Sequence, residues 1–144
     1  MASYRFIPMY PAKYAGDPKR IFARSKWEFN YMGLIDKSPV VLRWLSEPKQ
    51  LNISYVDPVD RQVKQYWPDF LIQYKDGSKE LVELKPLRQA KFNPNDVYDK
   101  IMFARNVAKW EAASRFCKRN NVKFRVVTEK QLNTKKRKQA RKKK

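Results

Sequence analysis

The sequence predicts one domain of the α/β (α+β) class, with a central mixed sheet flanked by helices. Apolar residues make up 42% of the 144 residues and aromatic residues 14%, which is enough for a hydrophobic core. Segments with helical periodicity alternate with short segments rich in β-forming residues, without an internal repeat. A strong hairpin signal in the middle of the chain adds an antiparallel pair to the expected sheet.

The first third of the chain is expected to hold an arm, a helix and a short segment of uncertain type. Residues 1–22 contain three prolines and no sustained periodicity, which predicts an extended N-terminal arm. Ser25 and Glu28 fit a capping box, and apolar residues then recur at helical spacing over residues 25–36. Residues 40–45 are rich in β-formers and fit either a strand or a turn of helix.

The rest of the chain predicts a hairpin followed by a long helix and a last strand. Strands are expected over 51–56, 66–74 and 79–85, and Lys75-Asp76-Gly77-Ser78 joins the last two. Beyond Pro86 the sequence predicts a basic loop over 87–97 and a helix over 98–119. A strand over 122–127 and a short helical turn over 128–132 follow. We therefore expect a folded domain over 23–133 and a basic, disordered tail over 134–144.

The charge of the chain indicates a polyanionic partner. Thirty-three Lys and Arg against fourteen Asp and Glu give a net charge of +19, far more than solubility requires. Eight of the last ten residues are basic, so 11 of these net charges belong to the preceding residues. No apolar run approaches the roughly 18 residues of a spanning helix, and no lipidation motif is present. Nucleic acid is therefore favoured over a membrane as the partner.

The absence of histidine limits the chemistry that the chain can perform. With one cysteine, Cys117, and no histidine, the chain cannot form an internal disulfide, a Cys-His zinc site or a His-activated nucleophile. The N-terminus also lacks the apolar core of a signal peptide, so an intracellular protein is expected. An enzyme with this composition would have to use carboxylates, lysine and metal.

Charged residues interrupt both apolar strands of the hairpin. Asp69 follows Pro68 at the start of one strand, and Glu83 and Lys85 lie on the other. Because side chains alternate faces, Glu83 and Lys85 share a face while Val82 and Leu84 point the opposite way. These charged residues fit either a converging site or a solvent-facing ladder of ion pairs, and the apolar surroundings favour the site.

The length of the turn decides whether Asp69 joins that face. A three-residue loop with Gly77 in the left-handed conformation pairs Tyr74 with Ser78, and therefore Asp69 with Glu83. A two-residue turn would place Asp69 on the other face unless a bulge at Pro68 corrected it. Opposed carboxylates need a cation between them, and hard oxygen ligands suit Mg²⁺ or Mn²⁺. Lys85 could orient or deprotonate a metal-bound water, or neutralise charge on a phosphate.

Pro68-Asp69, a spacer and Glu83-Leu84-Lys85 resemble the signature of the PD-(D/E)xK nuclease superfamily. Arg24-Ser25-Lys26-Trp27-Glu28 is similar to the helix start of TnsA-type endonucleases and of the head completion nucleases of T-even tailed phages. Similarity to the latter extends to four further motifs, P-x-K-Y-x-G-x-P at 11–18, V-x-x-W-x-S-E at 41–47, Y-x-x-P-x-D at 55–60 and A-K-W-x-A-A-x-x-F-C-K-R at 108–119.

This resemblance implies a restriction-endonuclease-like core and a metal-dependent deoxyribonuclease that acts on phage heads after DNA packaging. It implies Asp69, Glu83 and Lys85 as catalytic residues, with Glu28 assisting in metal binding or water positioning. Glu47 lies in a matched motif, and a structural role is expected for it. Location in the host cytoplasm during assembly follows, and retention in the virion head and contacts with head or portal proteins stay open.

Basic residues near the expected site are candidates for DNA contact, namely Arg24, Arg88, Lys91, Arg105 and Lys109. The apolar residues Phe103, Trp110 and Cys117 of the long helix are expected in the core. A non-catalytic DNA-binding head protein with the same fold is the main alternative, and an RNA-associated basic protein is a third. Monomer and dimer, and internal and end-directed cutting, are equally compatible with the sequence.

Overall fold

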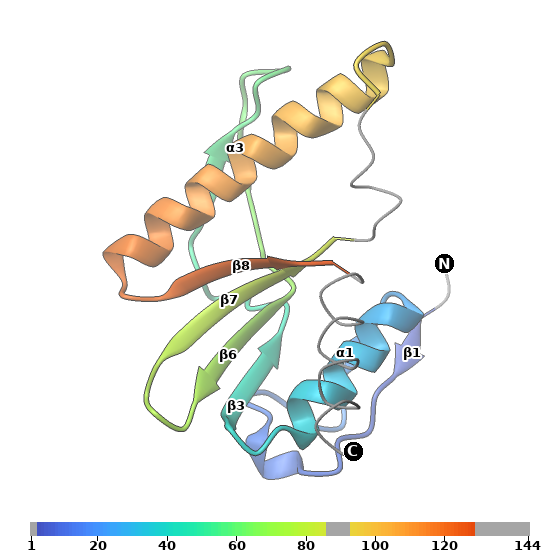
Figure 1. Ribbon diagram of the computed structural model, residues 1–144, viewed down its shortest axis with the longest axis vertical. Coiled ribbons are helices and arrows are strands. Elements are labelled where there is room, and N and C mark those ends of the chain that lie inside the picture. The colour runs from blue at the N-terminus through green and yellow to red at the C-terminus, as the bar shows by residue number, and fades with distance from the viewer. Residues whose placement is uncertain (1–2, 86–92, 129–144) are drawn as a thin grey trace, which may run out of the picture.

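A computed structural model describes residues 3–85 and 93–128 of the chain. Its centre is a four-stranded sheet in the order β3-β6-β7-β8, in which β3, β6 and β7 are antiparallel neighbours and β8 runs parallel to β7 (Figure 1). The strands span Val41–Ser46 (β3), Phe70–Tyr74 (β6), Lys79–Leu84 (β7) and Lys123–Val127 (β8). The predicted α+β class with a mixed central sheet is confirmed, and the segment at 40–45 is a strand.

A helix covers each face of the sheet. Helix α1 (Lys26–Lys37) begins at Ser25, whose hydroxyl accepts the N–H of Glu28 at 3.0 Å, as the predicted capping box requires. It packs with Val82 and Leu84 in one buried cluster. Helix α3 (Val97–Arg119) packs with Leu81 in a second cluster on the opposite face. The order of layers is therefore α1, sheet, α3.

The hairpin has the three-residue loop that the acidic site requires. Gly77 has φ of +91°, and the N–H of Tyr74 donates to the carbonyl of Ser78 at 2.8 Å. Phe70 then pairs with Val82, so the next position along the hairpin sets Asp69 opposite Glu83. The register predicted from the turn is confirmed.

Two of the predicted strands are shorter than expected, and one of them belongs to a separate hairpin whose second strand, over 63–65, was not predicted. Strands β4 (Ser54–Val56) and β5 (Val63–Gln65) pair with each other, and the main sheet resumes only at Phe70. The predicted strand over 66–74 is therefore wrong in its first four residues. Pro68 explains part of this interruption because it has no N–H for a ladder hydrogen bond.

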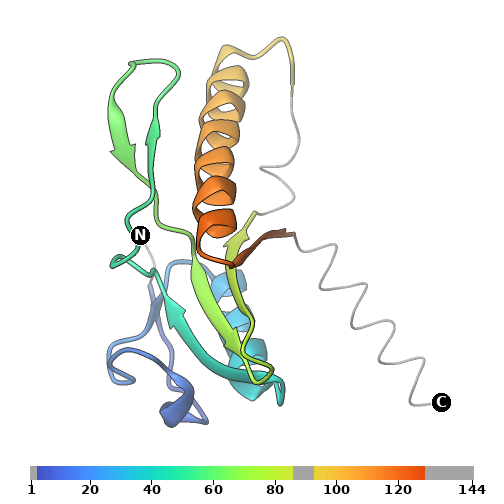
Figure 2. The same ribbon diagram turned by 90° about the vertical axis from the view of Figure 1, so that its left-hand side faces the viewer.

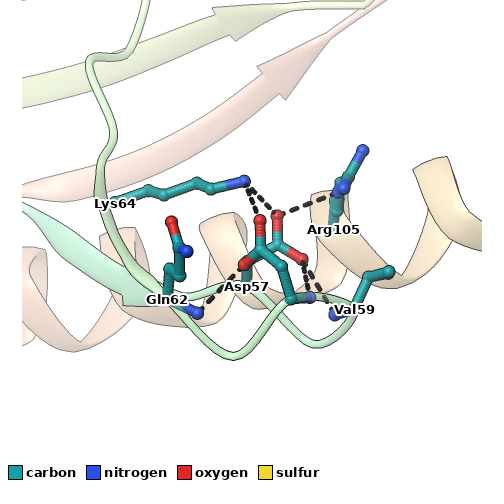
Figure 3. Close-up of polar contacts among 6 residues, drawn as sticks. Asp57, Val59, Gln62, Lys64 and Arg105 are labelled. Atoms are coloured by element: carbon teal, nitrogen blue, oxygen red, sulfur yellow. Dashed lines mark hydrogen bonds and ion pairs between the residues drawn. The ribbon is translucent and has the colours of Figure 1, made fainter.

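The β4–β5 hairpin extends beyond the sheet alongside the N-terminal half of α3 (Figure 2). Asp57, directly after β4, ties the two together (Figure 3). Its side chain is 0% exposed and accepts Lys64 Nζ at 2.8 Å and Arg105 Nε at 2.9 Å. The N–H groups of Val59 and Asp60 donate to its other oxygen.

The N-terminal segment lies against the core. It contains the paired strands β1 (Tyr4–Arg5) and β2 (Phe22–Ala23) and the short 3-10 helix η1 (Pro11–Lys13). Phe6 and Ile21 are buried in the cluster that includes α1. The residues predicted as an extended arm are thus packed against the domain that follows them.

Helix α3 departs from prediction at one apolar position. Cys117 is buried and Trp110 is partly buried against the α3 cluster, as expected. Phe103 is 52% exposed, because the first half of the helix lies beyond the sheet that covers the second half. No helix in residues 3–85 and 93–128 has the length and apolarity needed to cross a membrane. The predicted turn at 128–132, apart from Thr128, and the tail lie outside the described residues.

Candidate functional site

The hairpin brings Asp69 and Glu83 together at the end farthest from its turn. Asp69 is 8% exposed, and its Oδ2 accepts the backbone N–H of Leu84 at 2.7 Å. Glu83 is half-buried, and its Oε2 accepts the hydroxyl of Tyr66 at 2.6 Å. Each carboxylate thus has one oxygen fixed by a protein donor. Their burial and their partners exclude a solvent-facing ladder of ion pairs.

The electrostatics of this pair favour a cation. Burial raises the pKa of Asp69 above its ordinary value, although the Leu84 N–H and Arg24 oppose the rise. Burial, and then the negative charge of Asp69, raise the pKa of Glu83 to about 8. A carboxylate with a raised pKa is one whose charge is poorly compensated. A divalent ion close to both groups would compensate it.

Arg24 is the cation that the acids contact in this structure. Its Nη2 donates to Asp69 Oδ1 at 2.9 Å, and its Nε lies 3.1 Å from Glu47 Oε1 and 3.7 Å from Glu28 Oε2. Burial alone would lower the pKa of Arg24, but the charges of Glu28, Glu47, Asp69 and Glu83 outweigh it and raise that pKa. Three acids from separate parts of the chain therefore contact one guanidinium, and Glu83 acts on it through its charge.

Glu28 enters the site from the first turn of α1. Glu28 is only 6% exposed, and its Oε1 is buried without a hydrogen-bond partner among the described residues. Burial raises its pKa. An unsatisfied buried carboxylate oxygen is costly in a structural residue, whereas a metal ligand or water-positioning group needs a free oxygen. The capping box and this position near Asp69 are compatible, because the cap uses the backbone N–H of Glu28.

Glu47 is a site residue for which the sequence predicted only a structural role. It follows β3 with φ of +47°, in the left-handed region that non-glycine residues rarely occupy. Its N–H donates to the carbonyl of Asp69 at 2.9 Å, while its carboxylate reaches Arg24. Backbone strain of this kind is often found at functional sites. The sequence did contain a signal for this role, because Glu47 lies between the end of a strand and Pro48, within the V-x-x-W-x-S-E motif.

Lys85 lies on the α3 side of the hairpin. Its Nζ is 4.6 Å from the centre of the Trp110 ring, a cation–π contact, and its backbone N–H donates to the carbonyl of Val127. Tyr66 and Trp110 belong to the same apolar cluster, so Glu83 and Lys85 face the same side, as predicted. The ammonium group therefore lies over an aromatic ring in this structure.

The predicted DNA-contacting residues have different surroundings. Arg24 contacts the acids, and the Nε of Arg105 is bonded to Asp57. Lys109 lies 5.9 Å from the centre of the Tyr55 ring, and its charge opposes the rise in the pKa of Glu83. Arg88 and Lys91 lie outside the described residues.

The carboxylates of the site are the right kind of ligand for a hard divalent cation, but their present spacing does not form a metal site. Carboxylate oxygens are the ligands that Mg²⁺ and Mn²⁺ prefer, and the buried Glu28 Oε1 has no hydrogen-bond partner in the part of the chain that the structure describes. Within residues 3–85 and 93–128, however, no three acidic or cysteine side chains are grouped closely enough to hold a metal as they stand. Glu28, Glu47 and Asp69 contact the guanidinium instead, so metal binding would require these side chains to move.

Comparison with known proteins identifies the family of the chain. The head completion nuclease of Enterobacteria phage T4 is 28% identical over 141 aligned residues, which cover 88% of this chain and 91% of that protein. Residues 38–129 match the family described as TnsA-like endonuclease N terminal, a range that includes Glu47, Asp69, Glu83 and Lys85 but begins after Arg24 and Glu28. This match covers more than half of the chain. The protein therefore belongs to the TnsA-like endonuclease family.

Proposed function

We propose that the protein is a metal-dependent deoxyribonuclease that hydrolyses phosphodiester bonds at the Asp69–Glu83 end of the hairpin. The observation that carries this proposal is the gathering of poorly compensated acids, with Glu28 Oε1 buried and without a partner among the described residues, at the end of the hairpin strand that Lys85 directly follows. Family membership supports the same reaction class. The net charge of +19 suits a DNA substrate.

Each residue of the site has a different role in the proposed reaction. Asp69 and Glu83, assisted by Glu28, would hold Mg²⁺ or Mn²⁺, which supplies a Lewis acid and a bound water of lowered pKa. The Leu84 N–H fixes the Asp69 carboxylate, and the Tyr66 hydroxyl fixes that of Glu83. Lys85 would then orient the attacking water or neutralise charge that develops on the phosphate. None of these tasks requires histidine.

The test is cleavage of supercoiled plasmid and of linear duplex, with Mg²⁺, with Mn²⁺ and with EDTA. We expect metal-dependent cutting that falls at least about 100-fold in Lys85→Ala. Lys79→Ala is the matched control, because Lys79 is exposed on the same strand but at the turn end. Cutting that survives EDTA, or an unaltered rate in Lys85→Ala, would overturn the proposal. The two substrates separate internal from end-directed action.

A non-catalytic DNA-binding protein is the second candidate. It is favoured by the charge of +19 and by the absence of ready metal-ligand spacing in the described residues. Both candidates predict DNA binding that weakens with salt. Intact DNA under every metal condition, with binding preserved, would establish this alternative.

The biological role that we propose is completion of the phage head after DNA packaging, in the host cytoplasm. The similarity to the phage T4 protein along 88% of the chain supports it. We expect that the virus encoding this protein, when deprived of it, accumulates filled heads that do not join tails. Normal yields of infectious particles in its absence would contradict the role, without bearing on the chemistry.

A further inference from the structure

Arg24 and a divalent cation need the same oxygen of Asp69. Oδ2 is engaged by the backbone N–H of Leu84 at 2.7 Å, a bond fixed by the hairpin itself. Oδ1 is the remaining oxygen, and it is the atom to which Arg24 Nη2 donates at 2.9 Å. A guanidinium and a divalent ion on one oxygen repel each other, because both are positively charged and both would lie in contact with that oxygen.

The other acids show the same division. Tyr66 donates to one oxygen of Glu83. Glu28 has Oε2 toward Arg24, while its Oε1 is buried and has no hydrogen-bond partner within residues 3–85 and 93–128. The guanidinium thus lies among the oxygens that would hold a metal. This position also accounts for the lack of ready metal-ligand spacing among the described acids.

We propose that Arg24 is the resident counter-ion of the site, that it competes with the divalent metal for Asp69 Oδ1, and that it turns to a DNA phosphate when the metal binds. The inference rests on the proposed nuclease function and deepens it. Under this inference DNA and metal bind cooperatively. A DNA phosphate draws Arg24 away from Asp69, which frees Oδ1 for the metal, and the metal displaces Arg24, which frees the guanidinium for the phosphate.

The surroundings of Arg24 allow this exchange. Its side chain is 59% exposed, so a short movement brings the guanidinium to the surface. The guanidinium is a rigid plane that turns as a unit about the side-chain torsions, so its departure from Asp69 Oδ1 also changes the 3.1 Å contact of Nε with Glu47. A guanidinium binds phosphate through two parallel hydrogen bonds, so a DNA phosphate is a suitable new partner.

The test measures binding of Mn²⁺ alone to the full chain, from the electron paramagnetic resonance signal of free Mn²⁺. We expect Arg24→Met to bind Mn²⁺ about 10-fold more tightly than the wild type, a coupling of ordinary size. Arg24→Lys retains the positive charge and should stay close to the wild-type affinity. Arg20→Met is the matched control, because Arg20 is a largely exposed arginine that pairs with Asp17 outside the site.

A second measurement adds a short DNA duplex to the same titrations. DNA should tighten Mn²⁺ binding more in the wild type than in Arg24→Met, because the variant has no counter-ion left to displace. Circular dichroism checks that each variant is folded. If Arg24→Met does not fold, Arg24→Gln replaces it, because its amide can donate a hydrogen bond that supports the fold. Since glutamine is neutral and does not repel a cation, we expect the same tighter binding of Mn²⁺.

Three results would overturn the inference, namely unchanged or weaker Mn²⁺ binding in the folded neutral variant, an equal gain in Arg24→Lys, or equal tightening by DNA in both proteins. Cleavage by the wild type separates this failure from failure of the proposed function. If the wild type cuts DNA with metal but Arg24→Met binds Mn²⁺ no more tightly, the proposed nuclease function holds and only the competition between Arg24 and the metal is refuted. Absence of both cutting and Mn²⁺ binding would remove both.

Discussion

Two of the buried aspartates, Asp57 and Asp69, have opposite surroundings. Asp57 accepts hydrogen bonds from Lys64, Arg105 and two backbone N–H groups, which together hold its pKa well below the usual range; the bond from Lys64 is the largest cause. The pKa of Asp69 is raised by burial, although Arg24 and one N–H contact it. A fully compensated carboxylate stabilises a fold, whereas a poorly compensated one is suited to bind a ligand. The comparison predicts different consequences when either acid is neutralised.

The largest expected effect is on cleavage. Asp69→Asn retains an acceptor for the Leu84 N–H but removes the charge, so we expect the rate of DNA cutting to fall at least about 100-fold while the protein stays folded. Asp57→Asn is the matched control and should cut at the wild-type rate at a temperature where it is folded. A plasmid-nicking assay checks both. Normal cutting by Asp69→Asn would remove this acid from the site.

The next effect is on stability and should fall on the other aspartate. Asp57→Asn leaves Arg105 without a carboxylate partner at the junction of β4–β5 and α3, so we expect the melting temperature to fall by roughly 5 °C or more. Asp60→Asn is the control, because Asp60 shares Lys64 with Asp57 but is more exposed. Calorimetry measures both. Equal melting temperatures for the wild type and Asp57→Asn would show that this network does not stabilise the domain.

The same contrast predicts opposite dependence on pH. Glu83 has a folded-state pKa of about 8 against an ordinary value of 4.5, so the folded state binds its proton more tightly than the unfolded state. Its contribution to stability is therefore present at low pH and is lost as pH rises toward about 8. Asp57, whose pKa is lowered, contributes stability above its ordinary pKa and loses it as pH falls below about 4.

Melting temperatures measured against pH without metal would check these signs. Glu83→Gln should flatten the fall in stability between about pH 5 and pH 8, whereas Asp57→Asn should flatten the fall on the acid side. Added Mg²⁺ should also reduce the fall toward pH 8, since a bound cation stabilises the ionised Glu83. A Glu83→Gln protein with the wild-type slope in that range would contradict the assignment of the raised pKa.

Local chemistry was sufficient to predict the hairpin half of the site. The left-handed Gly77 determines the turn length, the turn determines the register, and strand alternation places Glu83 and Lys85 on one face with Val82 and Leu84 on the other. These relations involve neighbours in the chain or across one ladder. They therefore do not depend on how distant segments fold together.

The parts that the sequence did not predict depend on distant contacts or on unusual backbone. Arg24 reaches Asp69 across 45 positions, so a basic residue that looked available for DNA is paired with acids. The positive φ of Glu47 has no glycine to mark it. The break between β5 and β6 depends on Tyr66, whose N–H donates to the carbonyl of Ile53 instead of to the main sheet. The β propensity of residues 66–69 does not reveal this break, so the predicted strand ran from 66 to 74.

The smallest expected effect concerns Lys85, which lies on the same hairpin as the poorly compensated acids. Trp110 contacts Lys85 Nζ through its ring, so Trp110→Leu should lower kcat by about 3-fold to 10-fold with little change in KM, the size expected from loss of one cation–π contact. Trp67→Leu is the matched control, because the Trp67 ring holds Lys49 in a similar contact at 5.8 Å. A change confined to KM would assign Trp110 to DNA binding. Equal losses in both variants would mean that the ring does not position the lysine.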